Sequence, residues 1–69
     1  MNPKDKKNYK QIKEIVRNLE PDIYSEKRIE ELIRESGVRV HNMSSVLQVL
    51  TQTPYLEQLT NGNYMRTKR

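Results

Sequence analysis

The side chains best suited to contact another molecule lie between residues 43 and 53. Read at helical spacing, Met43, Val46, Leu47 and Leu50 form one apolar stripe. In a chain with 32% charged residues, a solvated helix face is more often Lys and Glu. Here the opposite side is uncharged, and its side chains can both donate and accept hydrogen bonds. They are Ser44, Ser45, Gln48, Thr51 and Gln52. The pattern indicates a helix that touches a partner closely, with DNA as the first candidate; the alternative is a core helix with a polar back.

Residues that could carry catalysis or hold a metal are sparse. The chain has no Cys and a single His, so it has no thiol nucleophile, no disulfide and no Cys- or His-based metal cluster. Glu26, Glu30 and Glu31 are predicted on the exposed side of a helix, where no pocket surrounds them. A Gly-rich phosphate loop is also absent from the sequence. We therefore expect no enzymatic activity, no cofactor and no metal site.

Charge is unevenly distributed along the chain. Residues 1–17 carry a net charge of +4, residues 18–36 carry −3 and residues 37–69 carry +3, for +4 overall. This distribution suits nucleic-acid binding, in which the two basic segments would face the polyanion and the acidic segment would face away from it. The alternative is that a charge of +4 merely keeps a small domain soluble.

The sequence shows no sign of membrane insertion or export. No apolar run approaches the ~20 residues that a membrane span needs. Met1 is followed by charged residues rather than by the apolar block of a signal peptide. We expect an intracellular protein with no membrane partner, either cytoplasmic and nucleoid-associated or nuclear.

The N-terminal third is predicted to form a basic arm and one helix. Residues 1–8 are polar and Lys-rich and are predicted as a flexible lead-in. Apolar residues recur at helical spacing from Tyr9 to Leu19, and Pro21 cannot continue a helix, so the helix is expected to end near residue 19 or 20. Residues 22–24 then form a short extended piece, where a small sheet often takes an extra strand.

Capping residues divide the middle of the chain into two more helices. Ser25 is the predicted N-cap of the second helix, and Gly37 lies where a left-handed C-terminal cap is needed. Asn42 is the predicted N-cap of a third helix over residues 42–53, which Pro54 ends.

The C-terminal part is predicted to form a β-hairpin over residues 55–67. Asn61-Gly62 is a strong two-residue hairpin signal, because both central residues of a type I′ turn have positive φ. The strands are expected near 55–60 and 63–67, before a basic tail at 68–69. The fold predicted is α+β and mainly helical: a single domain over residues 9–67, with three helices and a C-terminal two-stranded hairpin.

This order of elements resembles the winged-helix variant of the helix-turn-helix family. The resemblance covers the chain from Tyr9 to Arg66 and rests on the element order, the turn at Gly37 and the hairpin motif LEQLTNGNYMR. It implies a third helix in the major groove of double-stranded DNA and a hairpin, the wing, that touches the backbone or minor groove. Some winged helices bind proteins instead. The alternative is therefore a protein-interaction module of a larger assembly, using the same helix or the acidic face of residues 26–35.

DNA contacts are therefore expected from helix 42–53 and wing 55–67. Gln48 can pair with adenine, and Ser can serve either base of a pair. Asn42 is expected to act mainly as a cap, whereas Arg39 lies where it would reach the DNA backbone. The predicted contact residues are Arg39, Asn42, Ser44, Ser45, Gln48, Gln52, Asn61, Asn63, Arg66, Lys68 and Arg69.

The absence of Lys and Arg from residues 43–53 bears on specificity. Arg to guanine is the commonest specific base contact, so an A·T-rich preference is expected. Such a protein would be a small transcriptional regulator or a DNA-organising factor, with a homo-oligomer raising its occupancy. DNA binding requires the basic side chains among the predicted contacts to lie on the same side as Ser45 and Gln48. These are Arg39, Arg66, Lys68 and Arg69.

Overall fold

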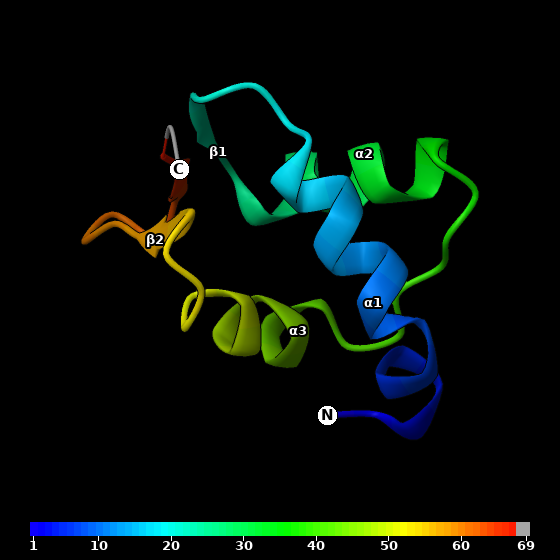
Figure 1. Ribbon diagram of the computed structural model, residues 1–69. Helices are drawn as coiled ribbons and strands as arrows, with labels where there is room; N and C mark the ends of the chain where they lie inside the picture. Colours follow the sequence, from blue (N-terminus) through cyan, green and yellow to red (C-terminus); the bar gives the residue numbers. More distant parts are fainter. Residues whose placement is uncertain (68–69) are drawn as a thin grey trace.

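Three helices and a small sheet make up the fold of residues 1–67, the part that the computed structural model describes. The elements follow in the order α1 (Pro3–Arg17), β1 (Ile23–Tyr24), α2 (Glu26–Glu35), α3 (Met43–Leu50), β2 (Leu56–Gln58) and β3 (Tyr64–Arg66). The helices lie together, and the sheet lies to one side of them (Figure 1). The predicted α+β class, with three helices and a C-terminal hairpin, is confirmed.

The hairpin belongs to a three-stranded antiparallel sheet with the strand order β1–β3–β2. The central strand is β3, in which Tyr64 pairs with Tyr24 on one side and with Gln58 on the other. The extended piece predicted at residues 22–24 therefore becomes an edge strand.

The turn of the hairpin differs from the predicted type I′ turn. Gly62 has a φ of 87°, but no non-glycine residue among those described has a positive φ, so Asn61 cannot take its type I′ position. The Gly62 N–H donates to the Leu59 carbonyl at 3.1 Å, and the Leu59 N–H donates to the Asn63 carbonyl at 2.8 Å. Residues 60–62 thus form a three-residue loop, in which the last position is left-handed and suits glycine.

Helix α1 begins at Pro3, well before the predicted start at Tyr9. The Asn2 side chain accepts the Lys4 N–H at 2.9 Å, and Pro3 occupies the first turn, where a missing N–H costs nothing. The predicted flexible arm at residues 1–8 is therefore wrong: residues 3–8 are helical. The helix also ends earlier than predicted, at Arg17.

The other predicted N-caps are confirmed. Ser25 Oγ accepts the Arg28 N–H at 3.1 Å at the start of α2, and Asn42 Oδ1 accepts the Ser45 N–H at 3.2 Å at the start of α3. Each interaction satisfies one of the backbone donors that a helix N-terminus leaves without a partner.

Gly37 ends α2 with the predicted left-handed geometry. Its φ is 88°, its N–H donates to the Arg34 carbonyl at 2.9 Å, and the Val38 N–H donates to the Ile33 carbonyl at 3.3 Å. These two bonds are the Schellman pair, which satisfies carbonyls at a helix C-terminus.

Helix α3 is shorter than the predicted helix 42–53. It ends at Leu50, and the next backbone bonds run from Gln52 to Val49 and from Thr53 to Leu50, three residues apart instead of four. The Thr53 hydroxyl also donates to the Leu50 carbonyl at 2.5 Å. The chain therefore leaves α3 through a tighter, 3₁₀-like turn. This turn ends before Pro54, whose ring disfavours helical geometry in the preceding residue.

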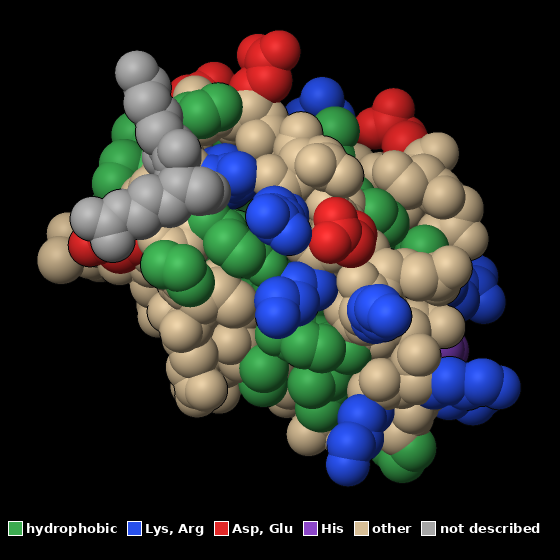
Figure 2. All heavy atoms as spheres, in the orientation of Figure 1, with side chains coloured by type: hydrophobic (Ala, Val, Ile, Leu, Met, Phe, Trp, Pro, Cys, Tyr) green, Lys and Arg blue, Asp and Glu red, His purple; other side chains and the backbone are tan. Residues whose placement is uncertain are grey.

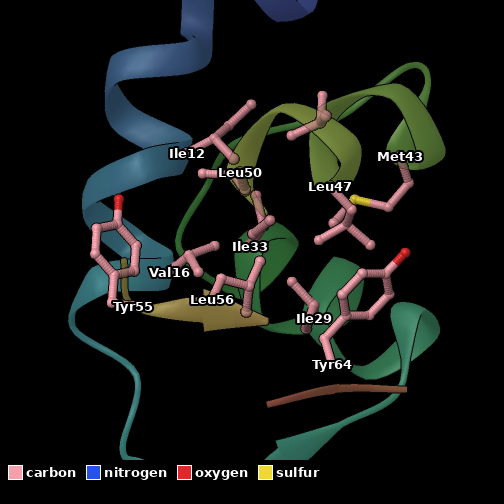
Figure 3. Close-up of a cluster of buried hydrophobic side chains, with 11 residues drawn as sticks. Ile12, Val16, Ile29, Ile33, Met43, Leu47, Leu50, Tyr55, Leu56 and Tyr64 are labelled. Carbon is pink, nitrogen blue, oxygen red and sulfur yellow. The ribbon is translucent and has the colours of Figure 1, made fainter. Parts of the chain in front are cut away.

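The core fills the space between the three helices and the inner face of the sheet (Figure 3). Tyr55 and Tyr64 close it on opposite flanks, Tyr55 beside α1 and Tyr64 beside α2. The apolar stripe predicted for α3 is buried as expected. Burying each large aliphatic side chain contributes about 1.5–3 kcal/mol. The buried side chains are Ile12, Val16, Ile29, Ile33, Met43, Val46, Leu47, Leu50, Tyr55, Leu56 and Tyr64.

Candidate nucleic-acid interface

The outward face of α3 carries no charged side chain. Opposite the buried stripe, Ser44, Gln48 and Gln52 are exposed, and Ser45 is half-buried. The helix itself, Met43–Leu50, contains no Lys, Arg, Asp or Glu. We call these four residues the α3 face. These side chains lie on the side of the helix away from the core, as the helical spacing predicts.

A buried carboxylate ties the start of α3 to the first turn of α1. Asp5 is 0% exposed; its Oδ1 accepts the His41 N–H and its Oδ2 accepts the Asn42 N–H, each at 2.7 Å. Among residues 1–67, none of the ion pairs includes Asp5. The two short bonds to an ionised acceptor offset the lost hydration of the carboxylate. The negative charge also lies near the N-terminus of α3, where the helix dipole favours it.

Basic side chains gather around this contact. Lys4, Lys6 and Lys7 flank Asp5 in α1 and are exposed, as are Arg39 and His41 on the connection that Asp5 holds. In the space-filling view, Lys and Arg side chains follow α1 from its first turn (Figure 2). The prediction of a flexible arm at residues 1–8 left Asp5 without a structural role. Asn2-Pro3 followed by an acidic residue is a helix-start signal that would have placed it in a first turn.

One acidic side chain borders the α3 face. The Ser44 hydroxyl donates to Glu26 Oε1 at 3.4 Å, across the gap between α3 and the start of α2. Burial raises the pKa of the Tyr64 hydroxyl, and the negative charge of Glu26 raises it further, so Glu26 also lies within electrostatic reach of β3. A carboxylate at this edge opposes a phosphate that approaches Ser44.

Arg66, predicted as a DNA contact, is buried instead and is only 8% exposed. Its Nε donates to the carbonyls of Val16 and Arg17 at 3.2 and 3.1 Å, and its Nη2 donates to Arg17 as well. The guanidinium lies 5.2 Å from the centre of the Tyr55 ring. These carbonyls end α1, where unpaired acceptors and the helix dipole both favour a cation. The DNA-contact prediction for Arg66 is therefore wrong, and the predicted convergence on the α3 face fails at this residue.

The other predicted residues are partly engaged within the protein. Asn42 caps α3, as expected, and Asn61 Oδ1 accepts the Asn63 N–H at 3.1 Å within the hairpin loop. Asn61 is exposed and Asn63 is half-buried. The predictions for Lys68 and Arg69 lie outside the described residues.

Two hollows of the surface lie away from α3. One of about 400 Å³ lies beside α1 and the segment after α2, and one of about 330 Å³ lies beside β1 and β3. Neither is lined by a residue of α3. Within residues 1–67, no cluster of three or more His, Asp or Glu could hold a metal ion, and no helix is long and apolar enough to cross a membrane.

Comparison with known proteins gives no relative. No family model, no curated protein and no solved structure matches the chain.

Proposed function

We propose that this chain is a small winged-helix protein that binds double-stranded DNA through the α3 face. The observation that supports this most directly is the Asp5 contact. It holds the lysines of the first α1 turns beside the start of a helix whose outward face is uncharged. A polar face next to a cluster of cations fits the surface of a duplex, which presents base edges between rows of phosphates.

In the proposed complex, α3 enters the major groove. Its eight residues are about 12 Å long at 1.5 Å per residue, comparable with the ~12 Å width of that groove. The Gln48 NH₂ group would donate a hydrogen bond to adenine N7, and the Gln48 carbonyl would accept one from adenine N6. The Ser45 hydroxyl can donate or accept, so it could contact either base of a pair. Arg39 and the lysines near Asp5 would contact phosphates, which adds affinity and salt dependence without sequence information.

An A·T-rich preference follows from the composition of the α3 face. Without Lys or Arg in Met43–Leu50, the helix lacks the usual bidentate contact to guanine, whereas Gln48 matches adenine. We propose that the protein acts as a small transcriptional regulator or DNA-organising factor with this preference.

The test is a fluorescence-anisotropy titration with A·T-rich and G·C-rich duplexes, for the whole chain and for two variants. Gln48→Ala removes the proposed adenine contact, and Gln11→Ala makes the same change at an exposed position of α1. Loss of a bidentate base contact should reduce the A·T preference about 10-fold in Gln48→Ala. Gln11→Ala should bind like the wild type.

Two results would contradict the proposal. Equal A·T preference in Gln48→Ala and wild type would remove α3 from base recognition. An absence of binding to either duplex at low salt would exclude DNA binding altogether and leave the protein-interaction module as the working hypothesis.

A further inference from the structure

Helix α1 carries a stripe of basic side chains on one side. Lys6, Lys10, Lys13 and Arg17 recur at intervals of four, three and four residues, and all four are exposed. Residues at these intervals share one side of an α-helix. The stripe is about 16 Å long at 1.5 Å per residue. Figure 2 shows Lys and Arg side chains along α1. We call these four residues the α1 stripe.

Little acidic charge offsets the stripe. Asp5 is buried in its contact with the start of α3, and Glu14 is exposed and pairs with Arg17 at 3.6 Å. Lys6, Lys10 and Lys13 take part in no ion pair within residues 1–67.

Helix α2 differs in this respect. Its four acidic and three basic residues give it a net charge of −1, and its Arg28 lies 3.5 Å from Glu31 and 3.7 Å from Glu35. The unpaired cations of α1 therefore mark the side of the molecule on which an external polyanion would be attracted most strongly.

The hairpin offers no comparable surface between residues 55 and 67. Arg66 is buried at the end of α1, and the remaining charged side chain of this segment is Glu57, which is exposed. Phosphate contacts by these residues of the hairpin would therefore have to come from uncharged groups.

We infer that the α1 stripe, in place of the hairpin, binds the phosphate backbone of the duplex that docks on the α3 face. This inference rests on the proposed function and specifies where its sequence-independent affinity comes from. The stripe starts next to Asp5, which is bonded to the start of α3, and then runs about 16 Å along α1. A duplex presents one phosphate per 3.4 Å of each strand, so a surface of this length faces several phosphates.

The polyanion favoured is nucleic acid more than an anionic membrane. An amphipathic helix binds a bilayer by burying its apolar side in the acyl region. In α1 that side is already occupied, because Ile12 and Val16 are 0% exposed in the protein core. The surface left to a partner is the row of cations.

The experiment compares two double variants that remove the same amount of charge. Lys10→Gln/Lys13→Gln neutralises the α1 stripe, and Lys27→Gln/Arg34→Gln neutralises two exposed cations of α2. DNA affinity is measured by fluorescence anisotropy at several salt concentrations, on A·T-rich and G·C-rich duplexes. Thermal unfolding by circular dichroism checks that each variant remains folded, which is expected because all four side chains are exposed.

The α1 variant should lose affinity equally on both duplexes. Removing two phosphate contacts should flatten the slope of log K against log salt concentration by about 1.8, and lower affinity roughly 10- to 100-fold at low salt. The α2 variant should keep the wild-type slope. An α1 variant that binds like the wild type, or that loses no more than the α2 variant, would overturn the inference.

Failure of the inference can be told apart from failure of the proposed function. Wild-type binding with an unaffected α1 variant would reject the α1 stripe and leave recognition by α3 intact. Loss of binding in the α1 variant, together with an unchanged preference in Gln48→Ala, would support the stripe and reject base recognition by α3. An absence of wild-type binding to any duplex at low salt would overturn both.

Discussion

Helix α1 is fixed at both ends by a buried charge, and the two ends are built differently. Near its start, Asp5 accepts two backbone N–H groups from the segment that leads into α3. At its end, Arg66 donates to the last carbonyls of α1 itself. Neither charge takes part in an ion pair within residues 1–67. In both cases backbone groups replace the missing counter-ion, with the sign that the helix dipole favours.

The difference lies in how completely each group is satisfied. Both oxygens of Asp5 hold a 2.7 Å bond, and the residue is 0% exposed. Arg66 bonds through Nε and Nη2, but its Nη1 is buried without a hydrogen-bond partner among the described residues, as is the Tyr55 hydroxyl. The start of α1 should therefore be the more sensitive of the two ends.

Asp5→Ala should be the most damaging of the substitutions considered. It leaves two backbone N–H groups without their acceptor, at about 1–3 kcal/mol each. Because small domains are stable by about 0.05–0.15 kcal/mol per residue, this loss is a large fraction of the total for 69 residues. Urea denaturation should show a decrease of about 3 kcal/mol in the free energy of unfolding. A decrease below about 1 kcal/mol would mean that the contact is not the main constraint on the start of α3.

Arg66→Ala should have a smaller effect, about 2 kcal/mol, because it also removes a buried Nη1 that has no hydrogen-bond partner among the described residues. Arg66→Lys keeps the charge but lacks the planar fork of donors, so it should recover less than half of the loss. The more informative measurement is the DNA affinity of the folded Arg66→Ala protein, which should equal that of the wild type. A selective loss of affinity in a folded variant would show that Arg66 contacts DNA after all.

The predictions from sequence held where the determining interactions are local. Ser25, Gly37 and Asn42 act through neighbours three to five positions away, so the residue type and its place in the pattern were sufficient. The uncharged face of α3 likewise follows from helical spacing alone. The function of that face does not follow, because it depends on a partner that neither the sequence nor the fold contains.

The two buried charges were missed because their partners are distant in the chain. The Asp5 contact with His41 spans 36 positions, and the contact of Arg66 with Val16 spans 50. A local signal existed for Arg66: it lies two residues after Tyr64, and alternate residues of a strand point to the same face. A buried Tyr64 therefore implies an inward-facing Arg66 once the strand is placed. The prediction instead assigned Arg66 to the DNA contacts of the wing.

The smallest expected effect comes from Glu26, a half-buried charge in contrast with the buried Asp5 and Arg66. Glu26 accepts from Ser44 at the edge of the α3 face, and its carboxylate would repel a nearby phosphate. Glu26→Gln keeps the shape and can still accept the Ser44 hydrogen bond, so stability should change by no more than about 0.5 kcal/mol. DNA affinity at low salt should rise by about 2- to 5-fold, because water still reaches part of Glu26 and weakens its interaction with a phosphate.

Glu20→Gln is the matched control for this substitution, because Glu20 is exposed and its side chain takes part in no ion pair within residues 1–67. Both variants raise the net charge by one, so a general electrostatic attraction would strengthen DNA binding equally in the two. A gain confined to Glu26→Gln would place the phosphates beside Ser44, at the start of α3. An equal gain in both would place the duplex elsewhere on the molecule, and would leave net charge as the sufficient explanation of binding.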